Sequence, residues 1–248
     1  MRSGFPGFPV EGMQFLRSLA RNNQRDWFQP RKPVFESQVK APMVELVTAL
    51  NRALAEFAPE YVTDPARAVF RIYRDTRFSK DKTPYKDHIA ASFSRRGLDK
   101  TGAGGYYFSV SDKEIEVGGG VYLPQPEILL AIRRHVAANY EELRRLLAVR
   151  AVKRLLGDLQ GEQLTRVPKG FDACHPAADL LRYKSYILYT TLSPEIATTP
   201  RLYSEVAKRF QAMTPFLDFI TGPLVRPKAQ PKRPKSGHFD DRRLPVAF

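Results

Sequence analysis

The fold class of this 248-residue chain is decided by one stretch, Gly105-Tyr-Tyr-Phe-Ser-Val110-Ser-Asp-Lys-Glu-Ile115-Glu-Val117-Gly-Gly-Gly-Val121. Tyr106, Phe108 and Val110 occupy alternate positions, as do Ile115 and Val117, and a period of two is typical of β-strands. The polar triplet Ser-Asp-Lys between the two runs is typical of a tight turn. We therefore predict an antiparallel hairpin with strands over 105–110 and 114–121. The three consecutive glycines lack the spacing of a nucleotide-binding loop, so we expect a bulge or a close backbone approach there.

Further strands and helices flank this hairpin on both sides. The composition predicts three more strands, over residues 68–74, 88–95 and 183–192. Apolar residues that recur every three or four positions predict helices over residues 10–21, 32–57, 126–149 and 200–220. Pro33 and Pro42 are expected to start or kink segments within the second of these. Strand runs flanked by helical runs indicate the α+β class, with a mainly antiparallel sheet of about five strands packed by helices from both termini.

Charge divides the chain into a body and a tail. The whole sequence has 40 Lys and Arg against 26 Asp and Glu, a net charge of +14. Residues 226–243 hold seven cations and two aspartates, a net of +5, which leaves +9 elsewhere. Prolines recur among these cations with almost no apolar side chains, a composition typical of an extended, solvated segment. We expect one domain over residues 1–224 and a disordered, flexible basic tail over 225–248.

Neither a membrane span nor an export signal is evident in the sequence. The longest stretch without a charged residue, 101–111, is eleven residues long, short of the roughly 18–20 that cross a bilayer. Glycines and prolines interrupt the apolar run that a signal peptide would need near the N-terminus. The single cysteine cannot form an internal disulfide, and no Cys or His cluster has metal-ligand spacing. We expect a cytoplasmic protein without a metal or cofactor.

The densest chemistry lies at Arg71-Ile-Tyr-Arg-Asp-Thr-Arg-Phe-Ser-Lys-Asp-Lys-Thr-Pro-Tyr-Lys-Asp-His88, which holds six cations and three aspartates. If the preceding strand continues to Arg74, alternation places this arginine on the apolar face with Phe70 and Ile72. A guanidinium there needs a carboxylate partner, which we expect from one of the three aspartates of the segment, Asp75, Asp81 or Asp87.

Two hypotheses fit this segment. In the first, its cations converge on an anion such as phosphate, because guanidinium forks match the oxygens of that group. The candidate anion-binding residues are Arg71, Arg74, Arg77, Lys82 and Lys86, with Lys169 and Lys184 from later in the chain. Asp75 and Asp81 would hold the guanidinium groups in place through supporting ion pairs. Tyr85 and His88 are candidates for donating or exchanging protons. In the second hypothesis, the same charges form an ion-pair network that fixes a loop between two strands.

A second constellation lies at Pro168-Lys-Gly-Phe-Asp-Ala-Cys-His-Pro176. Lys169 is expected in a turn, from which its side chain could reach a cleft. His175 precedes a proline and is therefore disfavoured as a helical residue, so it is a candidate either for capping the next helix or for acid–base chemistry. Cys174 lies beside His175 without an evident third group to orient the pair, so we expect an incidental thiol rather than a nucleophile.

The pattern R-x-x-R-D-x-R-F-x-x-D-K-x-x-Y, from Arg71 to Tyr85, resembles the signature of a bacterial family of conserved hypothetical proteins. The similarity extends from Phe15 through Asn22-Asn23, Trp27-Phe28 and the signature to residues 166–171 and 181–184, nearly the whole chain before the tail. The resemblance implies a domain of unknown function, so it supplies motif positions and no activity. The basic tail lies outside it.

Three functions therefore compete. The leading hypothesis is an Arg/Lys-lined cleft that binds a phosphorylated or carboxylated small molecule, with or without catalysis. The second is nucleic-acid binding by the basic body and tail, and the third is a structural or interaction protein whose charges only pair with one another. Because each Asp in the signature is flanked by cations that would compete with Mg²⁺, we do not expect metal catalysis.

Overall fold

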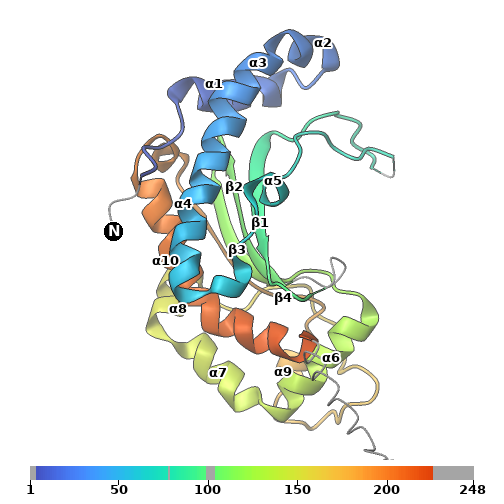
Figure 1. Ribbon diagram of the computed structural model, residues 1–248. Coiled ribbons are helices and arrows are strands. Elements are labelled where there is room, and N and C mark those ends of the chain that lie inside the picture. The colour runs from blue at the N-terminus through green and yellow to red at the C-terminus, as the bar shows by residue number, and fades with distance from the viewer. Residues whose placement is uncertain (1–3, 78, 99–103, 226–248) are drawn as a thin grey trace, which may run out of the picture.

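The structure is a computed structural model that describes residues 4–77, 79–98 and 104–225. At its centre lies a four-stranded antiparallel sheet with the strand order β1-β2-β3-β4 (Figure 1). The strands are β1 His88–Ser94, β2 Gly105–Ser111, β3 Ile115–Val121 and β4 Tyr186–Leu192. The expected α+β class and the hairpin of β2 and β3 are thus confirmed. The expected basic tail, from residue 226 onward, lies outside the described residues.

The prediction of a fifth strand over 68–74 is wrong. Ala68 ends the short helix α5 Pro65–Ala68, and the segment after it makes only the isolated bridges Val69–Ala91 and Tyr73–Tyr85. After Phe70, whose N–H donates to the Ala90 carbonyl of β1 at 2.9 Å, the chain leaves β1 and runs beside residues 84–86, where Pro84 has no N–H to donate to a ladder. The contact there consists of single hydrogen bonds, such as the one of 2.9 Å from the Arg74 N–H to the Pro84 carbonyl. Among the residues that the structure describes, the sheet therefore has four strands rather than about five.

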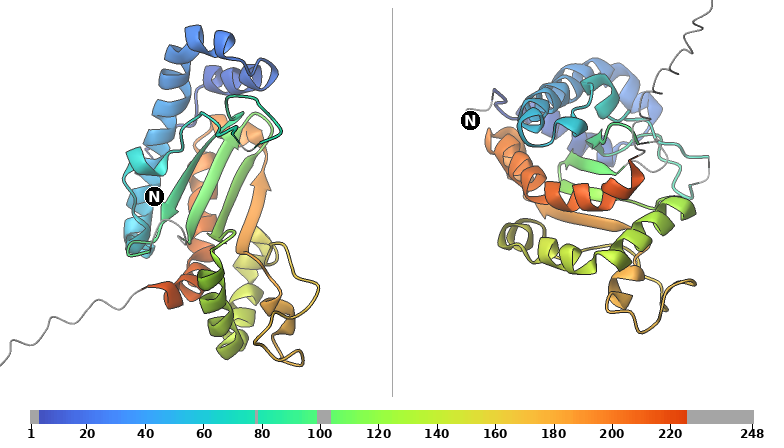
Figure 2. Two further views of the ribbon diagram at one scale, coloured as in Figure 1. Left: turned by 90° about the vertical axis from the view of Figure 1, so that its right-hand side faces the viewer. Right: turned by 60° about the horizontal axis from the view of Figure 1, so that its bottom comes forward.

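Helices cover one face of the sheet (Figures 1 and 2). The two longest, α4 Ala41–Phe57 and α10 Arg201–Thr221, lie against this face, and α1 Val10–Arg21 lies near one end of the strands. Alternation in the strands directs Phe93, Tyr106 and Phe108 to this face, where the ring of Phe210 from α10 packs on all three, with its centroid 4.5 Å from that of Tyr106. Gly119 of β3 allows α10 to approach, because a Cβ there would lie 2.5 Å from the Met213 sulfur. Of the two expected alternatives, a bulge or a close backbone approach, the second is confirmed at Gly120, where a Cβ would lie 2.1 Å from the Tyr186 carbonyl oxygen of β4.

The remaining helical segments that the structure describes have at most 13 residues each. The predicted helical region over 126–149 divides into two helices, and a third follows it: α6 Pro126–Ala138, α7 Tyr140–Ala148 and α8 Arg150–Leu156. The other α-helices are α2 Arg25–Phe28, α3 Lys32–Val34 and α9 Ala178–Leu181. Single 3₁₀ turns are η1 Gln29–Arg31, η3 Pro59–Tyr61, η4 Pro194–Thr198 and η5 Gly222–Leu224. Within the described part of the chain, no helix is both long enough and apolar enough to traverse a bilayer.

One irregular helical turn lies between α3 and α4. Residues Phe35–Lys40 form a π-helical turn, η2, just before Pro42. Pro42 has no N–H to donate to the Gln38 carbonyl, so the regular hydrogen-bond pattern is interrupted there. Gly12 of α1 packs against this carbonyl so closely that a Cβ on Gly12 would lie 2.1 Å from its oxygen. The lack of a side chain at Gly12 therefore allows helix α1 to pack closely against η2.

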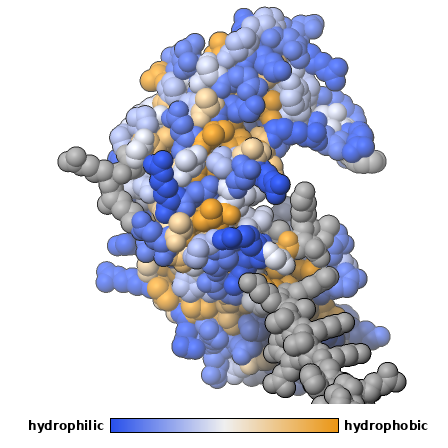
Figure 3. Space-filling model, viewed as in Figure 1, coloured by the Kyte–Doolittle hydropathy of each residue, from blue (hydrophilic) through white to orange (hydrophobic). Residues whose placement is uncertain are grey.

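The face of the sheet opposite α4 and α10 is not covered by helices in the described structure (Figure 2, left). The α1–α3 region lies beyond one end of the strands, and α6–α9 lie beyond the other. In the space-filling view the molecule is hollowed between these two parts (Figure 3). The signature segment leaves the sheet at the end nearer α1–α3.

Candidate functional site

Two adjoining depressions lie where the signature segment meets the corner between α1 and α2. The first cleft has a volume of about 330 Å³ and is lined by Arg25, Gln29, Tyr73, Arg74, Thr76, Pro84 and Tyr85. The second cleft has a volume of about 430 Å³ and is lined by Ala20, Asn23, Arg74, Asp81, Thr83, Tyr85, Lys86, Asp87 and His88. Arg74 and Tyr85 line both clefts and thus form the wall between them.

Tyr85 fixes the signature segment to the α1–α2 corner. Its backbone N–H donates to Asn23 Oδ1 at 3.0 Å, and its carbonyl accepts from Asn23 Nδ2 at 2.9 Å. Its ring, only 1% exposed, stacks on Phe28 at 4.1 Å between centroids and lies 5.4 Å from the ring of Tyr73. The position of Tyr85 is therefore set by both its backbone and its ring.

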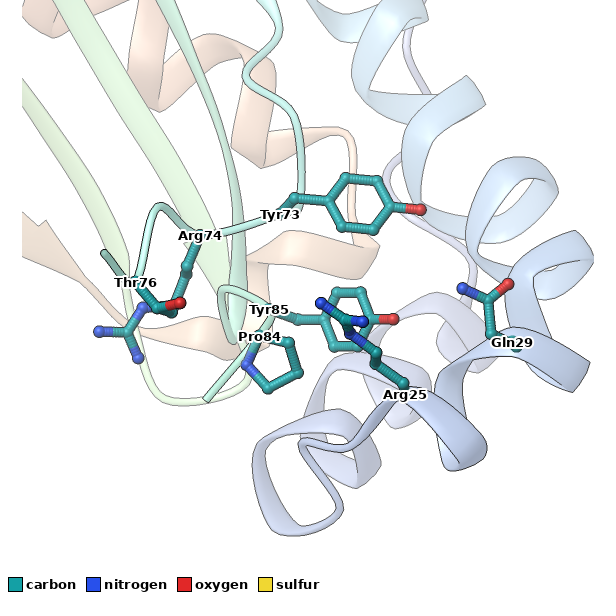
Figure 4. Close-up of a pocket in the computed structure, with 7 residues that line it drawn as sticks. All are labelled: Arg25, Gln29, Tyr73, Arg74, Thr76, Pro84 and Tyr85. Carbon is teal, nitrogen blue, oxygen red and sulfur yellow. The ribbon is translucent and has the colours of Figure 1, made fainter. Parts of the chain in front are cut away.

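The hydroxyl groups of two tyrosines face the first cleft. Figure 4 shows those of Tyr73 and Tyr85 directed toward the helical segment that carries Arg25 and Gln29. Burial, aided by Tyr73, raises the pKa of Tyr85, although the hydrogen bond from Gln29 and the charge of Arg25 oppose this shift. The Tyr85 hydroxyl is therefore protonated at neutral pH and able to donate a hydrogen bond.

Arg74 pairs with Asp81, one of the three aspartates that we expected as its partner. One guanidinium nitrogen of Arg74 donates to Asp81 and to the Thr83 hydroxyl. Asp81 also accepts from the Thr83 N–H and hydroxyl, each at 2.9 Å. The hydrogen bond from Arg74, followed by those from Thr83, lowers the pKa of Asp81 to about 2. The Arg74–Asp81 pair therefore links the two ends of the loop formed by residues 74–83 of the signature.

Two further cations of the expected anion site are engaged within the loop. Arg77 donates through Nε and a terminal nitrogen to the two carboxylate oxygens of Asp75, at 3.0 and 2.7 Å. These hydrogen bonds lower the pKa of Asp75. Lys82 donates from Nζ to the Thr76 carbonyl at 2.9 Å. Neither Arg77 nor Lys82 lines the two clefts, so the structure does not bring them together with Arg74 around one cavity.

Lys86 and His88 line the second cleft, while Arg71 is exposed beside it. The Lys86 ammonium lies 4.9 Å from the centre of the Phe70 ring, and burial together with the charge of Arg71 lowers its pKa. His88 Nδ1 lies 3.1 Å from an oxygen of Asp87. Burial opposes ionisation of Asp87, but the hydrogen bond and charge of His88 outweigh it and lower the pKa of this carboxyl. The residues that line the second cleft therefore carry both positive and negative charges.

The remaining expected residues lie far from the signature. Tyr186 pairs with Val121 at the end of the sheet opposite His88, so Lys184 lies at that far end, where its Nζ is 2.5 Å from Glu162. Lys169 is exposed in the loop before α9. His175 accepts the Ala177 N–H on Nδ1 at 3.0 Å, next to the start of α9, as the capping alternative expects. The free thiol of Cys174 is exposed beside it.

Arg25 is the site residue that the sequence analysis missed. It lies 46 residues before Arg71 in the chain, next to Trp27-Phe28, and enters the site only because Asn23 and Phe28 dock on Tyr85. No spacing links the two segments in the sequence. No aspartate or glutamate is among the described residues that line the first cleft. Nor do the described residues include three or more His, Cys, Asp or Glu placed together to hold a metal ion.

A comparison with known families gives one match. The family model described as "Conserved hypothetical protein (DUF2461)" matches residues 11–219. This range includes the signature, both clefts and the whole sheet. No curated protein and no solved structure matches the chain.

Proposed function

Because the chain belongs to the DUF2461 family of conserved hypothetical proteins, we propose its function from the chemistry of the site: the first cleft binds the phosphate or carboxylate group of a small molecule. The observation that carries this proposal is the lining of the cleft, which combines two arginines with tyrosine hydroxyls and an amide, and includes no described carboxylate. Guanidinium and hydroxyl donors are the groups that proteins use to hold such anions.

Arg25 is the principal anchor in this proposal. It forms no ion pair with any carboxylate in the described part of the chain, so its guanidinium is available to a ligand. The charge of Arg25 acts on the Tyr85 hydroxyl, and Figure 4 shows the guanidinium of Arg74 pointing away from both tyrosine hydroxyls. Arg74 would therefore act mainly through its charge, held in place by Asp81.

The size of the cleft limits the ligand. A volume of about 330 Å³ is at the lower end of the roughly 300–1,000 Å³ typical of small-molecule sites. The cleft thus suits an anionic head group with a small remainder, rather than a large cofactor. The free, exposed thiol of Cys174 fits a reducing compartment, so a cytoplasmic location is part of the proposal.

The test is to titrate the full chain with inorganic phosphate and with acetate, and to measure binding by calorimetry and by the shift in thermal unfolding. R25Q removes the anchor, and R31Q is the matched control, because the Arg31 guanidinium lies 4.7 Å from the Trp27 ring centre and lines neither cleft. A hydrogen bond to a charged group contributes about 1.5–3 kcal/mol. We therefore expect R25Q to bind at least about tenfold more weakly and R31Q to bind like the wild type. Equal affinities of R25Q and R31Q would refute the proposal.

Nucleic-acid binding is the second candidate. It is favoured by the exposed cations of the α1–α3 region, namely Arg21, Arg25, Arg31 and Lys32. A polyanion could contact several of them at once, together with the basic residues after 225. The third hypothesis, in which the charges only pair with one another, accounts for the ion pairs of Arg74 and Arg77. Lys82 bonds to a carbonyl oxygen instead, and Arg25 has no ion-pair partner in the part of the chain that the structure describes.

A further inference from the structure

Glu116 lies on the uncovered face of the sheet, on the inner strand β3, and is held by three hydroxyl groups. The Ser109 hydroxyl donates to Oε2 at 2.7 Å, and the Tyr189 hydroxyl donates to Oε1 at 2.7 Å. The Tyr107 hydroxyl lies 3.5 Å from Oε2. The donors come from both neighbouring strands, β2 and β4, so the sheet itself builds the cluster. We call Tyr107, Ser109, Glu116, Gly118 and Tyr189 the Glu116 patch.

The strand register explains why these residues share a face. Glu116 is directly opposite Ser109 on β2 and Thr191 on β4. Its neighbours Ile115 and Val117 point to the other face, where both are fully buried in the core. The Glu116 patch therefore lies on the side that the described helices leave open (Figure 2).

The charge of the Glu116 carboxylate is not balanced by a positive partner among the residues that the structure describes. It forms no salt bridge with any cation that the structure describes, although cations exceed anions by 14 in the sequence. Glu116 is only partly exposed, and a carboxylate that is partly withdrawn from water is costly without a counter-charge. The three hydroxyl dipoles stabilise the charge but leave it uncompensated.

Two aromatic rings flank the carboxylate. Tyr107, Gly118 and Tyr189 form one row across β2, β3 and β4. The two tyrosine backbones are two strand spacings apart, about 10 Å, and Gly118 places no side chain between them. The ring of Tyr189 leans over Gly118, since its Cδ2 atom would lie 3.3 Å from a Cβ there. The ring of Phe70 extends the row, 6.4 Å from that of Tyr107.

We propose that the Glu116 patch binds the ammonium or guanidinium group of a small organic cation. The carboxylate would form a charge-assisted hydrogen bond with the cation, and the tyrosine faces would add cation–π attraction. A cation suits the patch better than a neutral polyol, because the protein already supplies hydroxyl donors to Glu116 and lacks only the positive charge. This proposal does not rest on the anion site, since no residue of the patch lines either cleft.

The test is a calorimetric titration of the full chain with n-butylammonium, and with n-butanol as its neutral isostere. E116Q keeps the size of the side chain and removes its charge. E127Q is the matched control, because Glu127 is an exposed glutamate in the first turn of α6. We expect the wild type and E127Q to bind n-butylammonium at least about tenfold more tightly than E116Q, and n-butanol to bind no variant measurably. Equal binding of the amine and the alcohol would overturn the proposal, as would equal affinities of E116Q and E127Q.

A second pair of variants keeps the proposal testable if E116Q fails to fold. Y189F retains the ring and the Glu116 charge, so it should bind n-butylammonium at least as well as the wild type. Y189L removes the ring and should bind more weakly than Y189F. Retention of full affinity by Y189L, or its loss in Y189F, would contradict the role assigned to the ring. R25Q should leave amine binding unchanged, which separates a failure here from a failure of the anion site.

Discussion

Asn23 is the single residue on which the docking of the signature depends most. Its side-chain amide satisfies both backbone groups of Tyr85, and an unsatisfied buried polar group costs about 1–3 kcal/mol. We expect N23A to lower the free energy of unfolding by that amount and to weaken phosphate binding, because Tyr85 loses its fixed position. Chemical denaturation and calorimetry measure the two effects.

The neighbouring Asn22 supplies the control for this prediction. Its side chain donates only to the Ser18 carbonyl within its own helix, at 2.9 Å. N22A should therefore leave phosphate affinity unchanged. If N22A and N23A weaken phosphate binding equally, Tyr85 is not positioned through Asn23.

The lowered pKa of Asp81 leads to a prediction about how the stability of the protein depends on pH. Its pKa in the folded protein is lowered from 3.8 to about 2 by Arg74. The stabilisation is therefore complete above about pH 4 and is lost as the pH falls toward 2. We expect D81N to lower the melting temperature at pH 5, and this difference from the wild type to disappear near pH 2. The control is D158N, which removes the exposed ion-pair partner of Lys153 after α8. If the difference in melting temperature between D81N and the wild type stays constant from pH 5 to pH 2, the Arg74–Asp81 pair is not the cause of the pH dependence.

At the residue scale, the sequence predicts contacts within the signature better than contacts between segments. The pairing of Arg74 with a nearby aspartate follows from local charge and spacing, and the structure contains it. Arg25 and Glu116 could not be predicted as site residues. Arg25 meets Tyr85 only through packing of α2 on a distant segment, and Glu116 gains two of its donors from the alignment of three strands. Only the tertiary fold creates such neighbours.

At the scale of elements, the fit between α1 and η2 leads to a prediction about Gly12. An alanine Cβ there would meet the Gln38 carbonyl at 2.1 Å, and overpacking of this kind costs about 1–3 kcal/mol. This cost exceeds the roughly 0.5–1 kcal/mol that alanine contributes to a helix. We therefore expect G12A to lower the free energy of unfolding, as measured by urea denaturation. G222A is the control, because a Cβ at Gly222 meets nothing within 4 Å; equal effects of the two variants would argue against a tight fit of α1.

The elements also show where sequence patterns succeed and where they fail. The hairpin of β2 and β3 was predictable because its alternation, turn and sheet pairing all agree. Residues 68–74 have a similar composition, but in the structure their backbone contacts β1 at Val69 and Phe70, and Pro84 then limits further pairing. The sequence places prolines in the second helical region, and the structure shows that Pro42 follows a π-helical turn rather than a sharp kink. Amino-acid composition predicts that a segment tends to adopt an extended backbone. A β-ladder also requires a neighbouring strand that can pair with the segment along its whole length.

At the scale of the whole molecule, charge is separated rather than uniform. Arg25, which has no ion-pair partner among the described residues, lines the first cleft, whereas the carboxylate of Glu116, which also lacks one there, lies on the open face of the sheet. The net charge of +14 therefore does not by itself indicate a general polyanion binder. The distinction between one anion site and an extended basic surface depends on how many charges a ligand neutralises.

Salt dependence separates these two possibilities for the intact chain. Each phosphate contacted on a single strand releases counterions and contributes a slope of about −0.7 to a plot of log K against log salt concentration. If the first cleft is the functional site, we expect inorganic phosphate to bind with a shallow slope, and R25Q to abolish most of that binding. A single-stranded oligonucleotide held by several cations of α1–α3 and the basic C-terminal segment would instead give a steep slope. R25Q would then weaken oligonucleotide binding only slightly, because Arg25 would be one contact among several. Fluorescence anisotropy with the oligonucleotide and calorimetry with phosphate, both over a series of chloride concentrations, measure the slopes. A steep slope for the oligonucleotide, together with phosphate binding that is the same in R25Q and wild type, would favour nucleic acid as the partner.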